Sequence, residues 1–306
     1  MHWPCIITAM VTPFTEQGDL DEQRAEELAR WLVHHGSEGL VVAGTTGESP
    51  TLSDSERERL YHAVRRGSGS ASIFMGTGSN DTRHSALMSR RAEEWGADGV
   101  IVVTPYYNKP PQEGLYRHFV HVAESVTIPV MLYNVPGRTG VNLDAETVAR
   151  IAQSCPNVAA IKEASGHLTT LDTLHQTCPN LYIYAGDDAL FYPGLTVGAH
   201  GVVSVAAHVV GEEMASLAEG FRNGNLAEAL RLHHRLLPIF RDLFTWPNPI
   251  PVKWLMNQLG QTVGPVRPPL VYPQDVTRLE SLRDRLATIQ QLRVRSSSSS
   301  NHSKIL

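Results

Sequence analysis

The hydrophobic pattern of the chain is a series of short apolar runs, rich in β-branched residues, that alternate with longer mixed stretches. There are eight such runs: Cys5–Val11, Gly39–Ala43, Ala71–Met75, Gly99–Val103, Pro129–Tyr133, Val158–Lys162, Leu181–Ala185 and Gly201–Val205. Most are continuously apolar, which is typical of strands buried on both faces of a parallel sheet. Their spacing matches the length of one strand-plus-helix unit. The pattern therefore predicts eight parallel strands.

The stretches between the runs have the period of amphipathic helices. Asp21–His35, Asp54–Arg66 and Thr82–Trp95 each place apolar residues on one side and charges on the other. Strands that alternate with helices in this number predict an α/β fold, the (β/α)8 TIM barrel. A doubly wound open sheet is the alternative. It usually carries a Gly-rich phosphate turn after its first strand, whereas the first run here leads into TPFTEQGD.

The rhythm changes after the eighth run, which predicts three regions. Residues 1–210 form the barrel. Residues 211–295 read as purely helical, interrupted by the proline cluster Pro247–Pro251, and are expected to form a C-terminal helical extension packed on the barrel. Residues 296–306 contain a serine run and are expected to be a disordered tail.

Composition narrows the class of protein. The 306 residues are 42% hydrophobic and carry a net charge of −5, which favours neither nucleic acid nor an anionic membrane as a partner. No stretch is as long and apolar as a membrane span. Cys5, Cys155 and Cys178 are odd in number and widely spaced, so neither a disulfide framework nor a cysteine zinc site is indicated. Because no secretory signal pattern opens the sequence, we expect a cytoplasmic protein.

Catalytic groups in TIM barrels lie at the C-terminal ends of the strands, and Lys162 ends the sixth run. Burial there would favour the neutral amine, which can attack a ketone to form an imine. The structural alternative is a lysine that extends to the rim or pairs with Glu163, and this residue alone does not decide between the two. Tyr133 ends the fifth run, where it could transfer protons or simply pack.

Two other segments at this end could bind carboxylates. Thr45 and Thr46, between Gly44 and Gly47, could present hydroxyl and N–H groups to an anion, or could form an ordinary turn that caps a helix. Arg138, in the loop after Tyr133, suits bidentate carboxylate binding, although a lone loop arginine is more often a solvated surface residue.

No pattern predicts a metal or nucleotide site. Asp187 and Asp188 read as a helix cap. His118 and His121 lack a third ligand, and His233 with His234 reads as a helix surface. The glycines at 76–78 lack the Gly-Lys-Ser/Thr ending of a phosphate loop.

Five segments in order resemble one family. They are GTTGES (Gly44–Ser49), TPYYNKP (Thr104–Pro110), YNVPGRTG (Tyr133–Gly140), IKEAS (Ile161–Ser165) and NPIPVK (Asn248–Lys253). Together they resemble the dihydrodipicolinate synthase / N-acetylneuraminate lyase family of pyruvate-dependent class I aldolases, from the first strand to about Tyr272.

The resemblance implies a role for each matched residue. Lys162 matches the lysine that forms the Schiff base, so that no cofactor is needed. Tyr133 matches the tyrosine that donates and accepts protons. Thr45 matches the threonine that links Tyr133 to a second tyrosine, Tyr107, which in the family comes from the neighbouring subunit. A homotetramer built as a dimer of dimers is therefore implied.

The resemblance also implies the substrates. Thr46 matches the residue that binds the pyruvate carboxylate, Val203 an aliphatic pyruvate contact and Gly186 a backbone contact near the substrate. Arg138 matches the arginine that binds the carboxylate of L-aspartate 4-semialdehyde and is generally lacking in sialic acid lyases. The implied reaction condenses this aldehyde with pyruvate, giving 4-hydroxy-tetrahydrodipicolinate for diaminopimelate and lysine biosynthesis.

Alternatives remain within this reading. Another pyruvate aldolase or dehydratase, acting on a sugar acid or hydroxy-oxoglutarate, would share Lys162 and Tyr133. A non-catalytic homologue ranks low because the catalytic residues are all present. The chain departs from lysine-inhibited members of the family at Asp54, Arg57 and His84. A cationic Arg57 disfavours a lysine ammonium, which predicts weak or absent lysine feedback.

Overall fold

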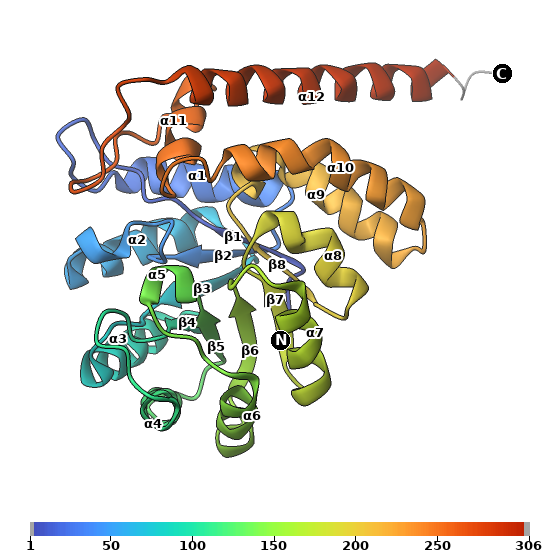
Figure 1. The fold of residues 1–306 in the computed structure, drawn as a ribbon. Helices are drawn as coiled ribbons and strands as arrows, with labels where there is room; N and C mark the ends of the chain where they lie inside the picture. Colours follow the sequence, from blue (N-terminus) through green and yellow to red (C-terminus); the bar gives the residue numbers. More distant parts are fainter. Residues whose placement is uncertain (1–2, 303–306) are drawn as a thin grey trace.

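The computed structural model describes residues 3–302, with side chains to residue 289, and forms a closed barrel of eight parallel strands (Figure 1). The strands are β1 (Ile6–Ala9), β2 (Gly39–Val42), β3 (Ser72–Gly76), β4 (Gly99–Val103), β5 (Val130–Asn134), β6 (Val158–Glu163), β7 (Tyr182–Ala185) and β8 (Gly201–Ser204). Each pairs with its neighbours in chain order, and β1 pairs with β8. The predicted (β/α)8 barrel is confirmed, and every strand lies inside or within one residue of its predicted run.

Helices follow the strands around the outside of the barrel. They are α1 (Glu22–His34), α2 (Asp54–Gly67), α3 (Thr82–Trp95), α4 (Gln112–Glu124), the short α5 (Pro136–Thr139), α6 (Ala145–Ser154), α7 (Leu168–Thr177), α8 (Phe191–Thr196) and α9 (Ala207–Arg222), with 3-10 turns η1 (Ser49–Thr51) and η2 (Asp188–Leu190). Local chemistry sets the ends. Ser53 and Glu56 form a capping box at the start of α2, and Gly96 ends α3 with a φ of 92°.

The strands separate two hydrophobic cores. Their outer faces pack against the helices, while alternate side chains fill the barrel interior. The interior cluster includes Ile7, Val41, Phe74, Ile101, Met131, Tyr133, Ala160, Tyr184 and Val203. Trp3 stacks on Phe74 at 5.3 Å between ring centroids and fills the N-terminal end. The interior is thus a packed core at this end, where the Tyr184 hydroxyl donates to the Pro4 carbonyl.

The C-terminal extension consists of α10 (Leu226–Asp242), α11 (Ile250–Gln258) and α12 (Thr277–His302). In Figure 1, α12 runs above α10 and extends past it. The predicted boundary at residue 210 falls on Val210, a kink inside α9. Helix α12 extends to His302 and includes the serine run at 296–300, where a disordered tail is expected from the sequence; residues 303–306 lie outside the described residues. Serine in a helix costs only a few tenths of a kcal/mol relative to alanine, so such a run does not by itself end one.

The histidine pair of α10 also differs from prediction. His234 is exposed as expected, but His233 is buried and stacks on Tyr192 of α8 at 5.6 Å between centroids. The sequence interpretation was wrong for His233 because neighbouring helical positions point about 100° apart, so two adjacent histidines need not share a face.

Candidate active site

The C-terminal ends of the strands surround a small cavity of about 40 Å³. Its wall is formed by side chains of β1, β2, β4, β5 and β6, by the glycines at the end of β3, and by the segment after β2 that holds Thr45 and Thr46. The polar side chains that reach it include Lys162 and Tyr133. The structure therefore brings together four of the predicted site residues, although they come from segments up to 117 positions apart in the sequence.

Lys162 points into this cavity rather than to the rim. It follows Ala160 on the inward-facing side of β6, and only 6% of it is exposed. Its Cα is paired with that of Tyr133 on β5, and its Nζ lies 4.4 Å from the centroid of the Tyr133 ring. Glu163 faces the other side of the strand and accepts hydrogen bonds from Asn134 Nδ2 and Ser165 N. A Lys162–Glu163 ion pair, the structural alternative, is not what the geometry shows.

Gly186, at the end of β7, leaves the space that Lys162 occupies. A Cβ at this position would lie 3.0 Å from Lys162 Cε and 2.5 Å from Ala164 Cβ. Any side chain here would displace the lysine. Val203 is buried in the barrel interior on β8 and belongs to the same cluster as Tyr133.

The turn that carries Thr45 and Thr46 has an unusual backbone. Ala43 and Glu48, which flank it, have φ values of 53° and 55°, in the left-handed region that L-residues rarely adopt. Thr46 is buried, and its Oγ1 accepts a hydrogen bond of 2.8 Å from Asn248 Nδ2. A hydroxyl that accepts from an amide directs its own proton elsewhere. The Thr46 hydroxyl is therefore free to donate to a further acceptor.

Arg138 and Tyr107 do not reach the small cavity. Arg138, on α5, lines an adjoining cleft of about 690 Å³ that also contains Thr45, Tyr106 and Asn248. Its Nη2 donates to the Asn248 carbonyl at 3.4 Å. Tyr107 is 88% exposed and has a φ of 74°, another left-handed non-glycine residue. Within one chain its ring is directed to solvent.

The two adjacent aspartates after β7, Asp187 and Asp188, have different roles. Asp187 caps η2 by accepting from Ala189 N, as predicted. Asp188 is buried instead and accepts from Val205 N and Ala206 N, which fixes the segment after β8. Burial raises the pKa of Asp188 to about 6. Within the described part of the chain, no cluster of three or more His, Cys, Asp or Glu side chains is arranged to hold a metal ion.

Comparison with known proteins agrees with this geometry. Residues 3–288 match the model of the dihydrodipicolinate synthetase family. The chain belongs to this family. A 4-hydroxy-tetrahydrodipicolinate synthase from Heliobacterium modesticaldum is 50% identical over 90% of the chain and 92% of its own length, and one from Bacillus subtilis is 48% identical over 89% and 94%.

Solved structures of the family have the same fold. Dihydrodipicolinate synthase from Cyanidioschyzon merolae, crystallised with lysine bound, has a TM-score of 0.89 and is 42% identical, with 92% of this chain and 96% of that one covered. A structure described as the first monomeric dihydrodipicolinate synthase variant has a TM-score of 0.89 and 39% identity, with 93% and 96% covered. Membership of the family thus does not by itself specify an oligomeric state.

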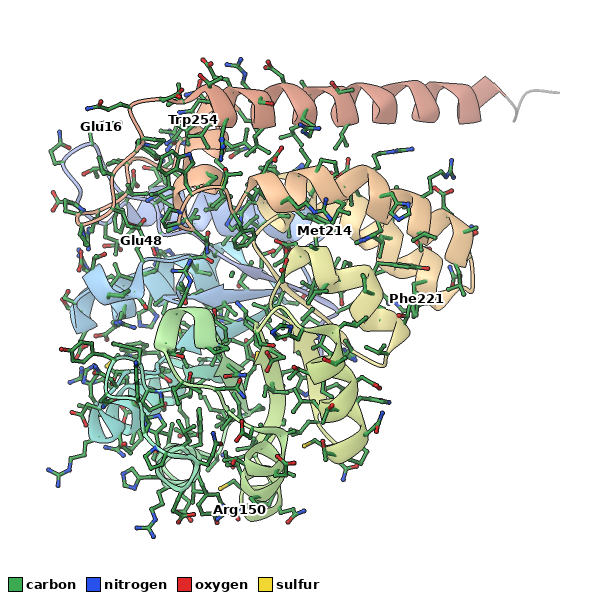
Figure 2. The ribbon with its side chains drawn as sticks, viewed as in Figure 1. Glu16, Glu48, Arg150, Met214, Phe221 and Trp254 are labelled. Carbon is green, nitrogen blue, oxygen red and sulfur yellow. The ribbon has the colours of Figure 1, made fainter. Side chains whose placement is uncertain are left out.

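The C-terminal extension supplies site residues for which the sequence indicated no role. Lys253 of α11 is fully buried, and its Nζ donates to Glu48 Oε1 at 2.9 Å and to two backbone carbonyls, those of Thr12 and Pro265. Figure 2 shows Glu48 on the side of the barrel that α11 covers. The NPIPVK segment was the available signal. Its function could not be seen because Glu48 and Lys253 are 205 positions apart.

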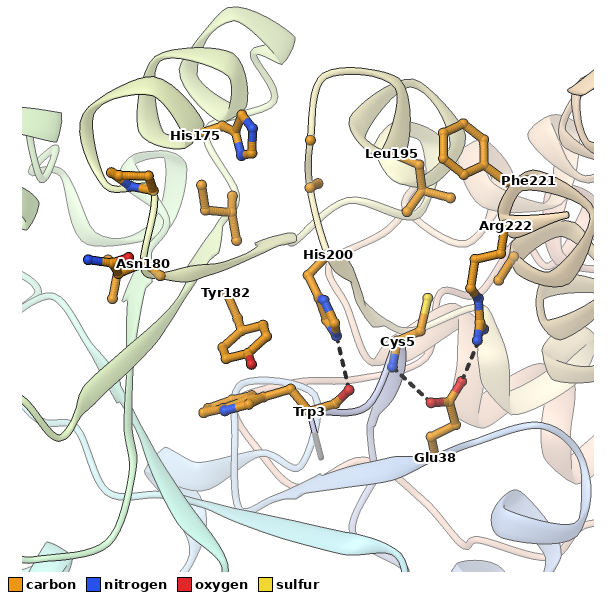
Figure 3. Close-up of a pocket in the computed structure, with 16 residues that line it drawn as sticks. Trp3, Cys5, Glu38, His175, Asn180, Tyr182, Leu195, His200, Phe221 and Arg222 are labelled. Carbon is orange, nitrogen blue, oxygen red and sulfur yellow. Dashed lines mark hydrogen bonds and ion pairs between the residues drawn. The ribbon is translucent and has the colours of Figure 1, made fainter. Parts of the chain in front are cut away.

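A second large cavity, of about 570 Å³, lies at the opposite, N-terminal end of the barrel (Figure 3). Several of its polar groups are engaged with one another. Glu38 accepts from Cys5 N and faces Arg222 at 3.8 Å, and His200 bonds the Trp3 carbonyl. Catalytic groups in TIM barrels lie at the other end of the strands.

Proposed function

We propose that this protein condenses pyruvate with L-aspartate 4-semialdehyde to give 4-hydroxy-tetrahydrodipicolinate, through an imine on Lys162 and without a metal or organic cofactor. The observation that carries the proposal is the Lys162 amine beside Tyr133 in a small cavity roofed by the threonine turn. The named relatives catalyse this reaction by their printed names. The 690 Å³ cleft with Arg138 adjoins the cavity and has room for a second substrate.

The geometry suits each step. The Lys162 amine attacks the ketone carbon of pyruvate, and the carbinolamine loses water to form the imine. Tyr133, whose ring lies against the amine, is placed to protonate the departing hydroxyl. Loss of a methyl proton then gives an enamine, whose carbon adds to the aldehyde carbon while the aldehyde oxygen takes up a proton. The amino group of the semialdehyde then attacks the regenerated imine carbon, which closes the ring and releases the Lys162 amine. The Thr46 hydroxyl is directed to the pyruvate carboxylate, with Val203 and the Gly186 backbone as further contacts.

Tyr107 is proposed to complete the proton relay from a neighbouring subunit through Thr45. Its exposure and left-handed backbone support a contact made outside its own chain. The proposed assembly is a homotetramer built as a dimer of dimers. Sedimentation would test this directly, and a fully active monomer would contradict it.

Arg138 decides between the proposed reaction and the alternative, a pyruvate aldolase for another aldehyde. A guanidinium at the edge of the cleft is suited to the carboxylate of L-aspartate 4-semialdehyde. The buried, unpaired cysteines are consistent with the proposed cytoplasmic setting. Within residues 3–302 no helix is both long and apolar enough to span a bilayer.

Two assays on the purified protein test the proposal. Pyruvate consumption with L-aspartate 4-semialdehyde, coupled to the next reductase, should show turnover. Borohydride reduction in the presence of pyruvate should add one pyruvate-derived mass to the chain, on Lys162. Lys162→Ala should abolish both signals, while Lys109→Ala, a matched change outside the cavity, should retain them. Trapping without turnover would move the second substrate to another aldehyde. The absence of both trapping and turnover would refute the proposal.

We also propose that lysine inhibits weakly or not at all. Asp54 is already paired, with Arg91 at 2.9 Å and His84 at 3.9 Å, and the adjacent Arg57 guanidinium repels an ammonium. The Cyanidioschyzon relative, by contrast, was solved with lysine bound. A lysine titration of the coupled assay checks this, and submillimolar inhibition would contradict it.

A further inference from the structure

The side chain of Arg57, on the first turn of α2, joins two walls of the active-site cavity. Its Nη2 donates to the Ser49 carbonyl at 2.7 Å, and its Nη1 donates to the Gly76 carbonyl at 3.0 Å. Ser49 directly follows the threonine turn as the first residue of η1, and Gly76 ends β3. Both line the 40 Å³ cavity that contains Lys162. One guanidinium thus extends the connection between these two walls beyond the last β2–β3 strand pair, Val42 with Met75.

The two walls approach each other too closely to be held by side-chain packing. A Cβ on Gly76 would lie 2.2 Å from the Ala43 carbonyl oxygen, so the backbones themselves are in contact. The turn between Ala43 and Glu48 begins and ends in the left-handed region. Such a conformation persists only where surrounding contacts hold it. From above, Lys253 holds the turn through Glu48; from the side of α2, Arg57 holds it through Ser49.

The charge of Arg57 is directed to these carbonyls and not to a carboxylate. Asp54, the nearest acid on the same helix, pairs with Arg91 and faces His84. Tyr106 lines the same cleft as Arg57. A planar guanidinium suits two separate acceptors, since its N–H groups point in fixed, diverging directions.

We propose that Arg57 is a positioning residue for pyruvate capture: by tying Ser49 to Gly76 it fixes the turn so that Thr46 meets the pyruvate carboxylate. The inference rests on the proposed function, in which that carboxylate is bound by the turn. It adds a residue that contacts no substrate and acts through the backbone. Loss of the guanidinium should lower the affinity for pyruvate and leave the chemistry of Lys162 and Tyr133 intact.

The test compares Arg57→Ala, Arg57→Lys and a matched control, Arg91→Ala. Arg91→Ala removes an equal charge from the partner of Asp54, on a side chain whose ion pair is with Asp54 and not with the turn. For Arg57→Ala we expect the pyruvate concentration that gives half-maximal borohydride trapping, and the KM for pyruvate, to rise about tenfold, with kcat changed by less than about threefold. Arg57→Lys, the safer variant for folding, should fall between. Guanidinium chloride, far below unfolding concentrations, should partly restore Arg57→Ala, whereas sodium chloride should not.

Each outcome decides the inference. Wild-type trapping with an unchanged half-maximal pyruvate concentration in Arg57→Ala would overturn it and leave the proposed function standing. An equal rise in Arg91→Ala would assign the effect to charge alone and overturn it too. If the wild type traps pyruvate but does not use L-aspartate 4-semialdehyde, the proposed second substrate fails while the Arg57 comparison remains valid. Failure of the wild type to trap pyruvate would overturn both.

Discussion

Replacing Lys253 by methionine should destabilise the protein strongly, because it leaves Glu48 charged inside the core. Lys253 is 0% exposed and its side chain is paired with a Glu48 side chain that is 1% exposed. Burial lowers the pKa of Lys253 to about 8, which shows how costly the site is for a cation, yet three hydrogen bonds are made by its Nζ. Breaking one partner of a buried pair typically costs about 3–5 kcal/mol.

The stability lost in Lys253→Met is measured as a decrease in melting temperature. For a chain of this size about 3–5 kcal/mol corresponds to a decrease of roughly 10 °C. Methionine keeps most of the side-chain volume, so the change reports charge and hydrogen bonding rather than a cavity. The Thr12 and Pro265 carbonyls also lose a donor, while Glu48 Oε2 keeps the bond from Arg267 N.

A second variant separates the charge from the packing. Lys253→Met with Glu48→Gln leaves no buried charge and should melt above Lys253→Met alone. Arg117→Met breaks the exposed Arg117–Glu113 pair and should have the same melting temperature as the wild type. A melting temperature of Lys253→Met within about 2 °C of the wild type would refute the reasoning. So would a double variant that melts no higher than the single one.

Three further predictions concern the site and the core. Arg138→Ala should raise the KM for L-aspartate 4-semialdehyde about tenfold or more in the coupled assay, with borohydride trapping of pyruvate unchanged; a loss confined to pyruvate would contradict its assignment. Tyr107→Phe and Lys162→Ala should each be nearly inactive, yet regain activity when dissociated and reassembled together, because a hybrid pairs an intact lysine with a partner's tyrosine; no recovery would place the tyrosine in its own chain. Burial lowers the pKa of His208 from 6.5 to about 4, so the unfolded state takes up a proton in this range and the native state does not. This proton uptake should lower the stability of the wild type by about 3 kcal/mol relative to His208→Gln as the pH drops from 6.5 to 4, measured by urea unfolding of both proteins; equal pH dependence in the two would count against it.

The architecture was predictable from the sequence because a strand buried on both faces requires a short, continuous run of apolar residues. Each apolar run ends where its β-strand ends, to within two residues, and Thr82–Trp95 was predicted with the bounds that α3 has. The position of Lys162 at the end of β6 follows from the same pattern. A barrel places all strand ends together, so the nearness of Lys162, Tyr133 and Thr45 could be expected without knowing a single long-range contact.

Only the tertiary structure decided which partners these side chains have. A Lys162–Glu163 ion pair is excluded because Glu163 accepts hydrogen bonds from Asn134 and Ser165 on the outer face of the strand. Local patterns record burial and period but not contacts between distant segments. The Lys253–Glu48 pair and the Asn248–Thr46 bond each span more than 200 positions and exist only because α11 lies over the barrel.

The same limit explains where interpretation of single residues was wrong or incomplete. His233 has a polar side chain but is buried where α10 packs on α8. In the sequence Arg57 is only a positive charge, and the structure shows that it donates to two backbone carbonyls. The sequence alone determined the barrel and the family, and it predicted Lys162 as the reactive lysine. Closure of the barrel and the docking of its C-terminal helices decided what holds the threonine turn, because those contacts form only when the whole chain is folded.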